Sequence, residues 1–107
     1  MTKQEVANMV GAMGFPWRLD HFSQTPTPPY IVYYYPAEND VHADNSNFVN
    51  RRQLHVELFT QKRDNMSEAI VEAKLKETGL SWYKQTDYLN DESLFQTTYE
   101  MEVIING

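Results

Sequence analysis

The sequence contains no cysteine, only four glycines and no long run of apolar residues. Without cysteine there is no disulfide, no thiolate nucleophile and no cysteine-based zinc site, which fits a reducing compartment. A membrane-spanning helix needs about 20 apolar residues in a row, and no stretch approaches that length. The first residues also lack the apolar segment of a secretion signal. We therefore expect a soluble protein that is made in the cytoplasm and does not contact a membrane.

Basic residues are also scarce, since nine Lys and Arg stand against 15 Asp and Glu, for a net charge of −6. Proteins that bind the phosphate backbone of nucleic acids carry a basic patch or stripe. Here the basic residues form no stripe, and Arg51-Arg52 and Lys62-Arg63 are pairs at most. We expect no sequence-specific nucleic-acid binding.

Catalytic signatures are missing as well, because the chain has no P-loop, dinucleotide fingerprint, EF-hand or zincin motif. Asp20, His21 and Ser23 combine a possible base and nucleophile, but they lie in a proline-rich loop without a nucleophile elbow. Glu100 and Glu102 share the polar face of a strand, where paired acids usually serve solubility. The sequence predicts neither an enzyme nor a cofactor.

One group of residues has metal-like spacing. His42 and Asp44 form one pair at i, i+2, and His55 and Glu57 form another, so each pair projects from one face of a strand. Four ligands converge only if the two strands pair in matching register. Both strands expose a polar face in any case, so a solvated sheet surface is the favoured interpretation, and these four residues stay as candidate ligands.

The strongest pattern in the chain is strand-like alternation. From Phe95 to Ile105 apolar side chains fall on the odd positions and most polar ones on the even positions, which predicts one long half-buried strand. Arg51–Thr60 alternates in the same way, and Tyr30–Tyr35 is an aromatic and β-branched run. Trp82–Leu89 predicts a strand that turns back at residues 90–93 to form a hairpin with the long strand. A short strand over Val41–Asp44 is also indicated.

Two helices are predicted. Thr2 and Glu5 form a capping box, and Gly14 ends a helix whose apolar stripe is Val6, Met9, Val10 and Met13. Asn65 is the expected cap of the second helix and Glu68 its capping-box partner. Its expected buried stripe is Met66, Ala69, Ile70 and Ala73, widened by Leu75 and Val71. Phe15-Pro16-Trp17 and the following loop Ser23–Pro29 are interpreted as an extended connector because of their prolines.

The 107 residues fit one domain, spanning 1–107. The expected order is helix, three strands, helix, two strands. Such an order predicts an α+β fold in which two helices pack on one face of a mostly antiparallel sheet of about five strands.

Aromatic residues exceed what a core of this size easily holds, with seven Tyr and two Trp. Surplus aromatics, together with an acidic segment, are typical of interfaces in homo-oligomers. A monomer with a tyrosine-rich core and rim is the alternative. The candidate interaction residues are Tyr33, Tyr35, Glu38, Asp40, Asp44, Trp82 and Tyr83.

Two blocks of the chain resemble a known family. The first holds Tyr30–Tyr35 ending at Pro36, the polar stretch Glu38–Asn45 and the strand Leu54–Thr60. The second holds Lys76-Glu77-Thr78-Gly79-Leu80, then Tyr83-Lys84-x-x-x-Tyr88 and Leu94-Phe95-Gln96-x-x-Tyr99-Glu100-Met101-Glu102. Over roughly residues 28–105 they resemble head–tail joining proteins of phages and prophages of Gram-positive bacteria. Within these proteins, the chain is most similar to the tail-completion, or tail-terminator, type of long non-contractile-tailed phages.

The resemblance implies a non-enzymatic α+β subunit that is monomeric or weakly associated when free. On assembly it forms a ring, of six copies in this family, which caps the head-proximal end of the tail tube and meets the head connector. Its partners are then other copies of itself, the tail tube protein and the connector or head-completion protein. Its location is the host cytoplasm during assembly and afterwards the virion.

An acidic balance suits a DNA conduit, because a negative lumen repels the backbone. The segment with Glu38, Asp40 and Asp44 is expected to line that lumen or to reach a neighbouring subunit. Two other functions stay open. One is a different head–tail connector or a minor tail protein, and the other is an acidic, host-directed regulator or inhibitor.

Overall fold

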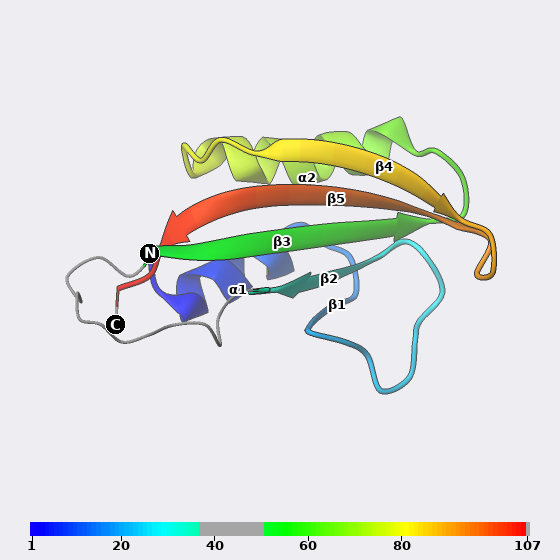
Figure 1. Cartoon of the computed structure of the whole chain (residues 1–107), viewed down its shortest axis with the longest axis horizontal. Helices are drawn as coiled ribbons and strands as arrows, with labels where there is room; N and C mark the ends of the chain where they lie inside the picture. Colours follow the sequence, from blue (N-terminus) through cyan, green and yellow to red (C-terminus); the bar gives the residue numbers. More distant parts are fainter. Residues whose placement is uncertain (37–50, 107) are drawn as a thin grey trace.

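The computed structural model describes residues 1–36 and 51–106. These residues form two helices and five strands, and Figure 1 shows the long strands β3 and β5 running through the middle of the molecule. The elements in chain order are α1 (Lys3–Gly11), β1 (Trp17–Leu19), β2 (Tyr30–Tyr34), β3 (Arg51–Thr60), α2 (Asn65–Glu77), β4 (Tyr83–Leu89) and β5 (Leu94–Ile104).

The five strands form one sheet in the order β1-β2-β3-β5-β4. β3 and β5 are antiparallel neighbours over ten residue pairs, from Arg51 opposite Ile104 to Thr60 opposite Phe95. β4 forms the expected hairpin with β5, and β2 runs antiparallel to β3. Only β1 and β2 are parallel, with Trp17 opposite Ile31.

The α+β class and the element order are confirmed, but the sheet is mixed where a mostly antiparallel one was expected. The parallel pair is formed by β1, which lies in the segment interpreted as a connector. The backbone amide of Ile31 donates to the Pro16 carbonyl at 2.9 Å, and that of Asp20 donates to the Tyr33 carbonyl at 2.8 Å. The strand predicted over 41–44 falls outside the described residues.

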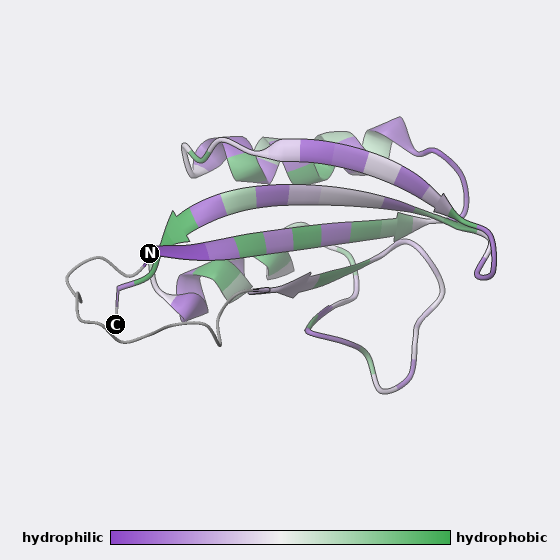
Figure 2. Ribbon diagram, viewed as in Figure 1, coloured by the Kyte–Doolittle hydropathy of each residue, from purple (hydrophilic) through white to green (hydrophobic). Residues whose placement is uncertain are grey.

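The sheet has one covered face and one open face. Alternate residues of β3 are buried, namely Leu54, Val56 and Leu58, and the hydropathy colours of Figure 2 alternate along this strand. These side chains belong to one core cluster that also contains Val10 of α1 and Val71 of α2. Both helices therefore pack on the same face. The open face carries the other set of strand residues.

Helix α1 begins as predicted. The Glu5 amide donates to Thr2 Oγ1 at 3.0 Å and the Thr2 amide donates to Glu5 Oε1 at 2.7 Å, which completes the capping box. The helix buries Val6, Met9 and Val10 and ends at Gly11, after which Gly14 adopts a φ of 90° that glycine tolerates. The predicted stripe is confirmed.

Helix α2 corrects two predictions. Its N-cap is Asp64, whose carboxylate accepts a hydrogen bond from the Ser67 amide at 3.0 Å, and not Asn65. Its buried side contains the expected Val71 and Leu75 together with Ser67 and Glu68, whereas Met66, Ala69, Ile70 and Ala73 of the expected stripe face solvent. Among the described residues, no helix has the length and apolar character needed to cross a membrane.

Candidate interaction surfaces

The open face of the sheet is built from cross-strand rows of mostly polar and aromatic side chains. One row joins Tyr34, His55, Glu100 and Tyr83 across β2, β3, β5 and β4. The next joins Val32, Glu57, Thr98 and Gln85. Because neighbouring rows share one face, carboxylates, hydroxyls and rings gather at its centre.

The side chains of Tyr34, His55 and Glu57 are linked on this face. The Tyr34 hydroxyl donates to Glu57 Oε2 at 2.7 Å and lies 3.2 Å from His55 Nδ1. Partial burial raises the pKa of the Tyr34 hydroxyl, and the Glu57 carboxylate raises it further, so Tyr34 remains a donor in neutral solution. The contacts fix three side chains on a solvent-facing surface.

The candidate metal ligands are not brought together in the described part of the chain. His42 and Asp44 lie outside it, and Glu57 already accepts the hydrogen bond from Tyr34. Across residues 1–36 and 51–106, no group of three or more His, Asp or Glu side chains is arranged to hold a metal ion.

The candidate interaction residues lie in three environments. Tyr33 and Tyr35 are buried in the core, which corrects the expectation that they supply contact surface. Trp82 is partly buried against the core, and Tyr83 is 67% exposed on the open face. Glu38, Asp40 and Asp44 lie outside the described residues.

The remaining acid–base candidates are separate surface residues. Asp20, His21 and Ser23 are exposed in the loop after β1, and within the described residues no hydrogen bond joins their side chains. Glu102 is exposed, while Glu100 is half-buried on the open face opposite His55. These positions give no cleft in which one carboxyl is desolvated, as general acid catalysis requires.

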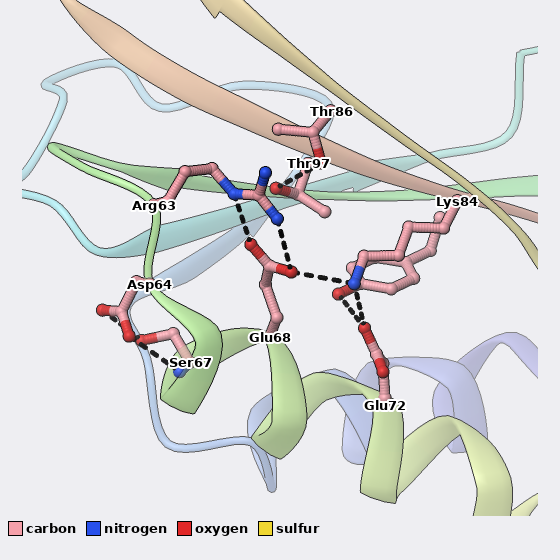
Figure 3. Close-up of polar contacts among 9 residues, drawn as sticks. Arg63, Asp64, Ser67, Glu68, Glu72, Lys84, Thr86 and Thr97 are labelled. Carbon is pink, nitrogen blue, oxygen red and sulfur yellow. Dashed lines mark hydrogen bonds and ion pairs between the residues drawn. The ribbon is translucent and has the colours of Figure 1, made fainter.

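A network of charges lies between α2 and the sheet (Figure 3). Glu68, whose side chain is only 5% exposed, bonds Arg63 at 3.2 Å and the Lys84 ammonium at 2.8 Å. Lys84 also bonds Glu72 at 2.6 Å, and the buried Tyr99 hydroxyl donates to the same Glu72 oxygen at 2.9 Å. The network fastens α2 to β4 and β5.

The network shifts the pKa values of its members. Burial alone would raise the pKa of Glu68, but hydrogen bonds from Lys84 and Arg63, together with their charges, outweigh burial and lower it. Hydrogen bonds to Glu68 and Glu72 raise the pKa of Lys84. Both shifts favour the ionised forms of Glu68 and Lys84 near neutrality, which suits a structural clamp and not a proton donor.

A groove separates the two helices where β5 ends. Its volume is about 730 Å³, and its lining comes from α1, the last turn of α2 and the end of β5. The apolar lining residues are Met1, Met9, Ala12, Leu80 and Ile104. Glu5 and Glu77 add carboxylates to the lining, whereas the side chain of Glu102, which also borders the groove, belongs to the open face. No sequence pattern indicates this groove, because it depends on how far apart the two helices lie on the sheet.

Comparison with protein-family models and with curated protein sequences found no match to this chain.

Proposed function

We propose that this chain is a structural phage protein that caps the head-proximal end of the tail tube and joins it to the head connector. Several copies form the ring that carries out this task. The proposal starts from the sequence resemblance, whose two blocks contain β2, β3, β4 and β5. These strands lie next to one another in the sheet, so the resembling residues within them form one continuous part of the sheet.

The observation that supports an assembly subunit best is the uncovered sheet face with its exposed edge strand. β4 is the last strand of the sheet, and five of its seven residues are exposed. Such an edge offers unpaired backbone groups to another chain. Beside it, Tyr83 and Glu100 supply the aromatic and polar groups that subunit contacts use.

Charge also supports this role. The open face carries Glu57, Glu100 and Glu102 from its two central strands, with Asp87 from the edge. If the ring surrounds the DNA path, carboxylates near the lumen repel the backbone and let DNA slide. The same role is proposed for the acidic residues Glu38, Asp40 and Asp44, which would line the lumen or reach a neighbouring subunit.

The experiment is to mix the purified protein with tail tubes of the same phage and to image them by electron microscopy. We expect a ring at one end of each tube and none along its wall. Tyr83→Asp, on the open face, should raise the protein concentration needed for half-maximal capping at least about tenfold, the effect of losing roughly 1.4 kcal/mol of contact energy. Gln24→Asp, in the exposed loop before β2, serves as the control with the same added charge.

Thermal unfolding should show that both variants stay folded, because Tyr83 and Gln24 are exposed, with a slightly lower unfolding temperature for Tyr83→Asp, which places a carboxylate opposite Glu100. Tubes that stay open at both ends would refute capping. Binding to isolated head connectors in that case would favour another joining protein. Capture of neither would leave the acidic, host-directed regulator as the better hypothesis.

A further inference from the structure

Helix α2 turns apolar side chains toward solvent at its N-terminal end. Met66 is 79% exposed and Ile70 is 43% exposed, one helical turn apart on the same side. Ala69 and Ala73 continue this exposed side. We call Met66, Ala69, Ile70 and Ala73 the α2 stripe. Isolated exposed apolar residues need no explanation, but a contiguous set at helical spacing indicates a contact surface.

The groove between the helices is concave, whereas the α2 stripe is a convex helix surface. It is about 730 Å³ in volume, which is enough to accept several side chains, and its apolar lining includes Met9, Leu80 and Ile104. Methionine side chains adapt to irregular partners, which suits a groove that receives a helix.

The α2 stripe and the groove lie at opposite ends of the same helix. Met66 is in the first turn of α2, while Glu77 and Thr78, at its last turn, line the groove. At a rise of 1.5 Å per residue, Met66 and Glu77 are about 16 Å apart along the axis. Figure 1 shows this run of α2 along the long direction of the molecule. One copy can therefore use both surfaces at once.

Charges near the two surfaces are complementary. Arg63 pairs with Glu68 and Lys74 pairs with Glu77 within the chain. Lys62 just before the stripe has no ion-pair partner among the described residues, and the helices carry the exposed carboxylates of Glu5 and Glu77 at the groove. The Met1 ammonium at the groove donates to the Ile104 carbonyl at 2.9 Å. A lysine beside the stripe thus matches a carboxylate at the groove.

We propose that the α2 stripe of one copy docks into the groove of a second copy. The contact uses two different surfaces, so it is head-to-tail, and it repeats until a rotation closes a ring. It rests on the proposed function in one respect, because it is then the contact between neighbouring ring subunits. A small-molecule occupant is disfavoured because the polar groups of the groove lining are carboxylates, one lysine, one threonine, one asparagine and the terminal ammonium, without aromatic side chains.

Disulfide trapping tests the contact, since the natural chain has no cysteine to interfere. Met66→Cys places a thiol on the stripe and Ala12→Cys places one at the groove. The two single variants are mixed at high concentration with oxidised glutathione and without tail tubes. We expect a mixed disulfide dimer of Cys at 66 with Cys at 12, formed at least about tenfold faster than either homodimer.

Gln24→Cys, in the exposed loop before β2, replaces Met66→Cys as the control for random collision. Lys62→Glu should slow formation of the mixed dimer about two- to fivefold, the range for one exposed ion pair, and Glu77→Lys in the partner should restore it. A mixed dimer that forms no faster than the control overturns the proposal. A dominant dimer linked through position 66 in both copies also overturns it, because that contact is two-fold symmetric.

The results of the trapping experiment and of the tube experiment distinguish failure of the subunit contact from failure of the proposed function. A mixed dimer without capping of tubes would leave the head-to-tail contact standing and refute the proposed function. Capped tubes without a mixed dimer would retain the function and place the subunit contact elsewhere, for instance on the β4 edge.

Discussion

Glu68 is a charged residue in a place that usually holds an apolar one. Its carboxylate bonds both Arg63 and Lys84, which are separated from each other by 20 residues of sequence. Glu68→Gln keeps the shape and removes the charge, leaving both cations with weaker acceptors. We expect the free energy of unfolding to fall by about 1–3 kcal/mol in urea titrations. Glu77→Gln, on an exposed side chain of the same helix, should change it by less than about 0.5 kcal/mol.

The same residue predicts a pH dependence. The folded-state pKa of Glu68 is lowered, because hydrogen bonds from Lys84 and Arg63 outweigh the opposing effect of burial. A lowered pKa stabilises the fold above the unfolded-state value of about 4.3, and this contribution is lost as the pH falls through the folded-state pKa. The stability gap between the natural protein and Glu68→Gln should therefore be full at pH 7 and shrink below about pH 4. A gap that stays constant down to pH 2 would contradict this account.

Tyr99 offers a second test of the network. Its ring is fully buried, and its hydroxyl donates to Glu72 Oε2 at 2.9 Å. Tyr99→Phe removes that donor while Lys84 still bonds Glu72, so thermal unfolding should report a loss of about 1 kcal/mol. Tyr83→Phe, on the exposed side of the neighbouring strand, is the control and should be neutral.

At the residue scale, the alternation of side chains along β2 determines which tyrosines are buried, and the number of aromatic residues does not. The run Tyr33-Tyr34-Tyr35 was expected to supply contact surface at its first and last members. A strand sends neighbours to opposite faces, so Tyr33 and Tyr35 enter the core together and Tyr34 lies on the open face. The period was readable from the sequence, but which face receives the helices depends on distant elements.

At the scale of elements, the N-cap of α2 distinguishes two adjacent residues. Asp64 accepts hydrogen bonds from the Ser67 amide at 3.0 Å and the Ser67 hydroxyl at 2.8 Å. Asp64→Ala should lower the free energy of unfolding by about 1 kcal/mol, the usual cost of losing a cap. Asn65→Ala, at the residue expected from sequence, should have little effect. Equal losses in chemical denaturation would mean that both residues contribute to the cap.

The rotation of α2 shows where sequence reasoning fails. Met66, Ala69, Ile70 and Ala73 have proper helical spacing, yet the helix buries Glu68 on its other side. Burying a carboxylate is unfavourable unless partners are in place. Those partners are Arg63 before the helix and Lys84 on β4, and their convergence appears only in the folded chain. Helix existence was predictable, but its orientation was not.

Strand β1 was missed for a related reason. Three residues carry little periodicity, and their hydrogen-bonding partners in β2 lie 14 residues further along the chain. The long strands β3 and β5 were predicted because each displays its alternation over ten or more residues. Length and local pattern therefore set what the sequence reveals.

For the whole molecule, the sheet order predicts a gradient of stability. β3 and β5 lie at the centre with neighbours on both sides, whereas β1 is a three-residue edge. Amide hydrogen exchange followed by NMR should be slowest in β3 and β5 and fastest in β1. The amides of β2, and those of β4 that bond to β5, should exchange at intermediate rates. Faster exchange at Val56 than at Arg18 would contradict the central position of β3.

The open face and the groove differ in how far the sequence predicts them. Alternation predicted one polar face for each of β3 and β5, and the register of the two strands brings His55 opposite Glu100. The groove could not be predicted, since its walls come from α1, α2 and β5. The tail-completion function is the proposal that the tube-capping experiment tests.

The charge network also restricts how α2 can pack on the sheet. Helix α2 has two nearly equal apolar sides, one with Val71 and Leu75 and one with Met66 and Ile70. Hydrophobic burial alone hardly distinguishes them, so α2 could roll about its axis and present either side to the sheet. Glu68 finds its cations in only one of these orientations. The ion pairs of Glu68 therefore favour the observed orientation over the rolled one, and replacing Glu68 by an apolar residue would remove that preference.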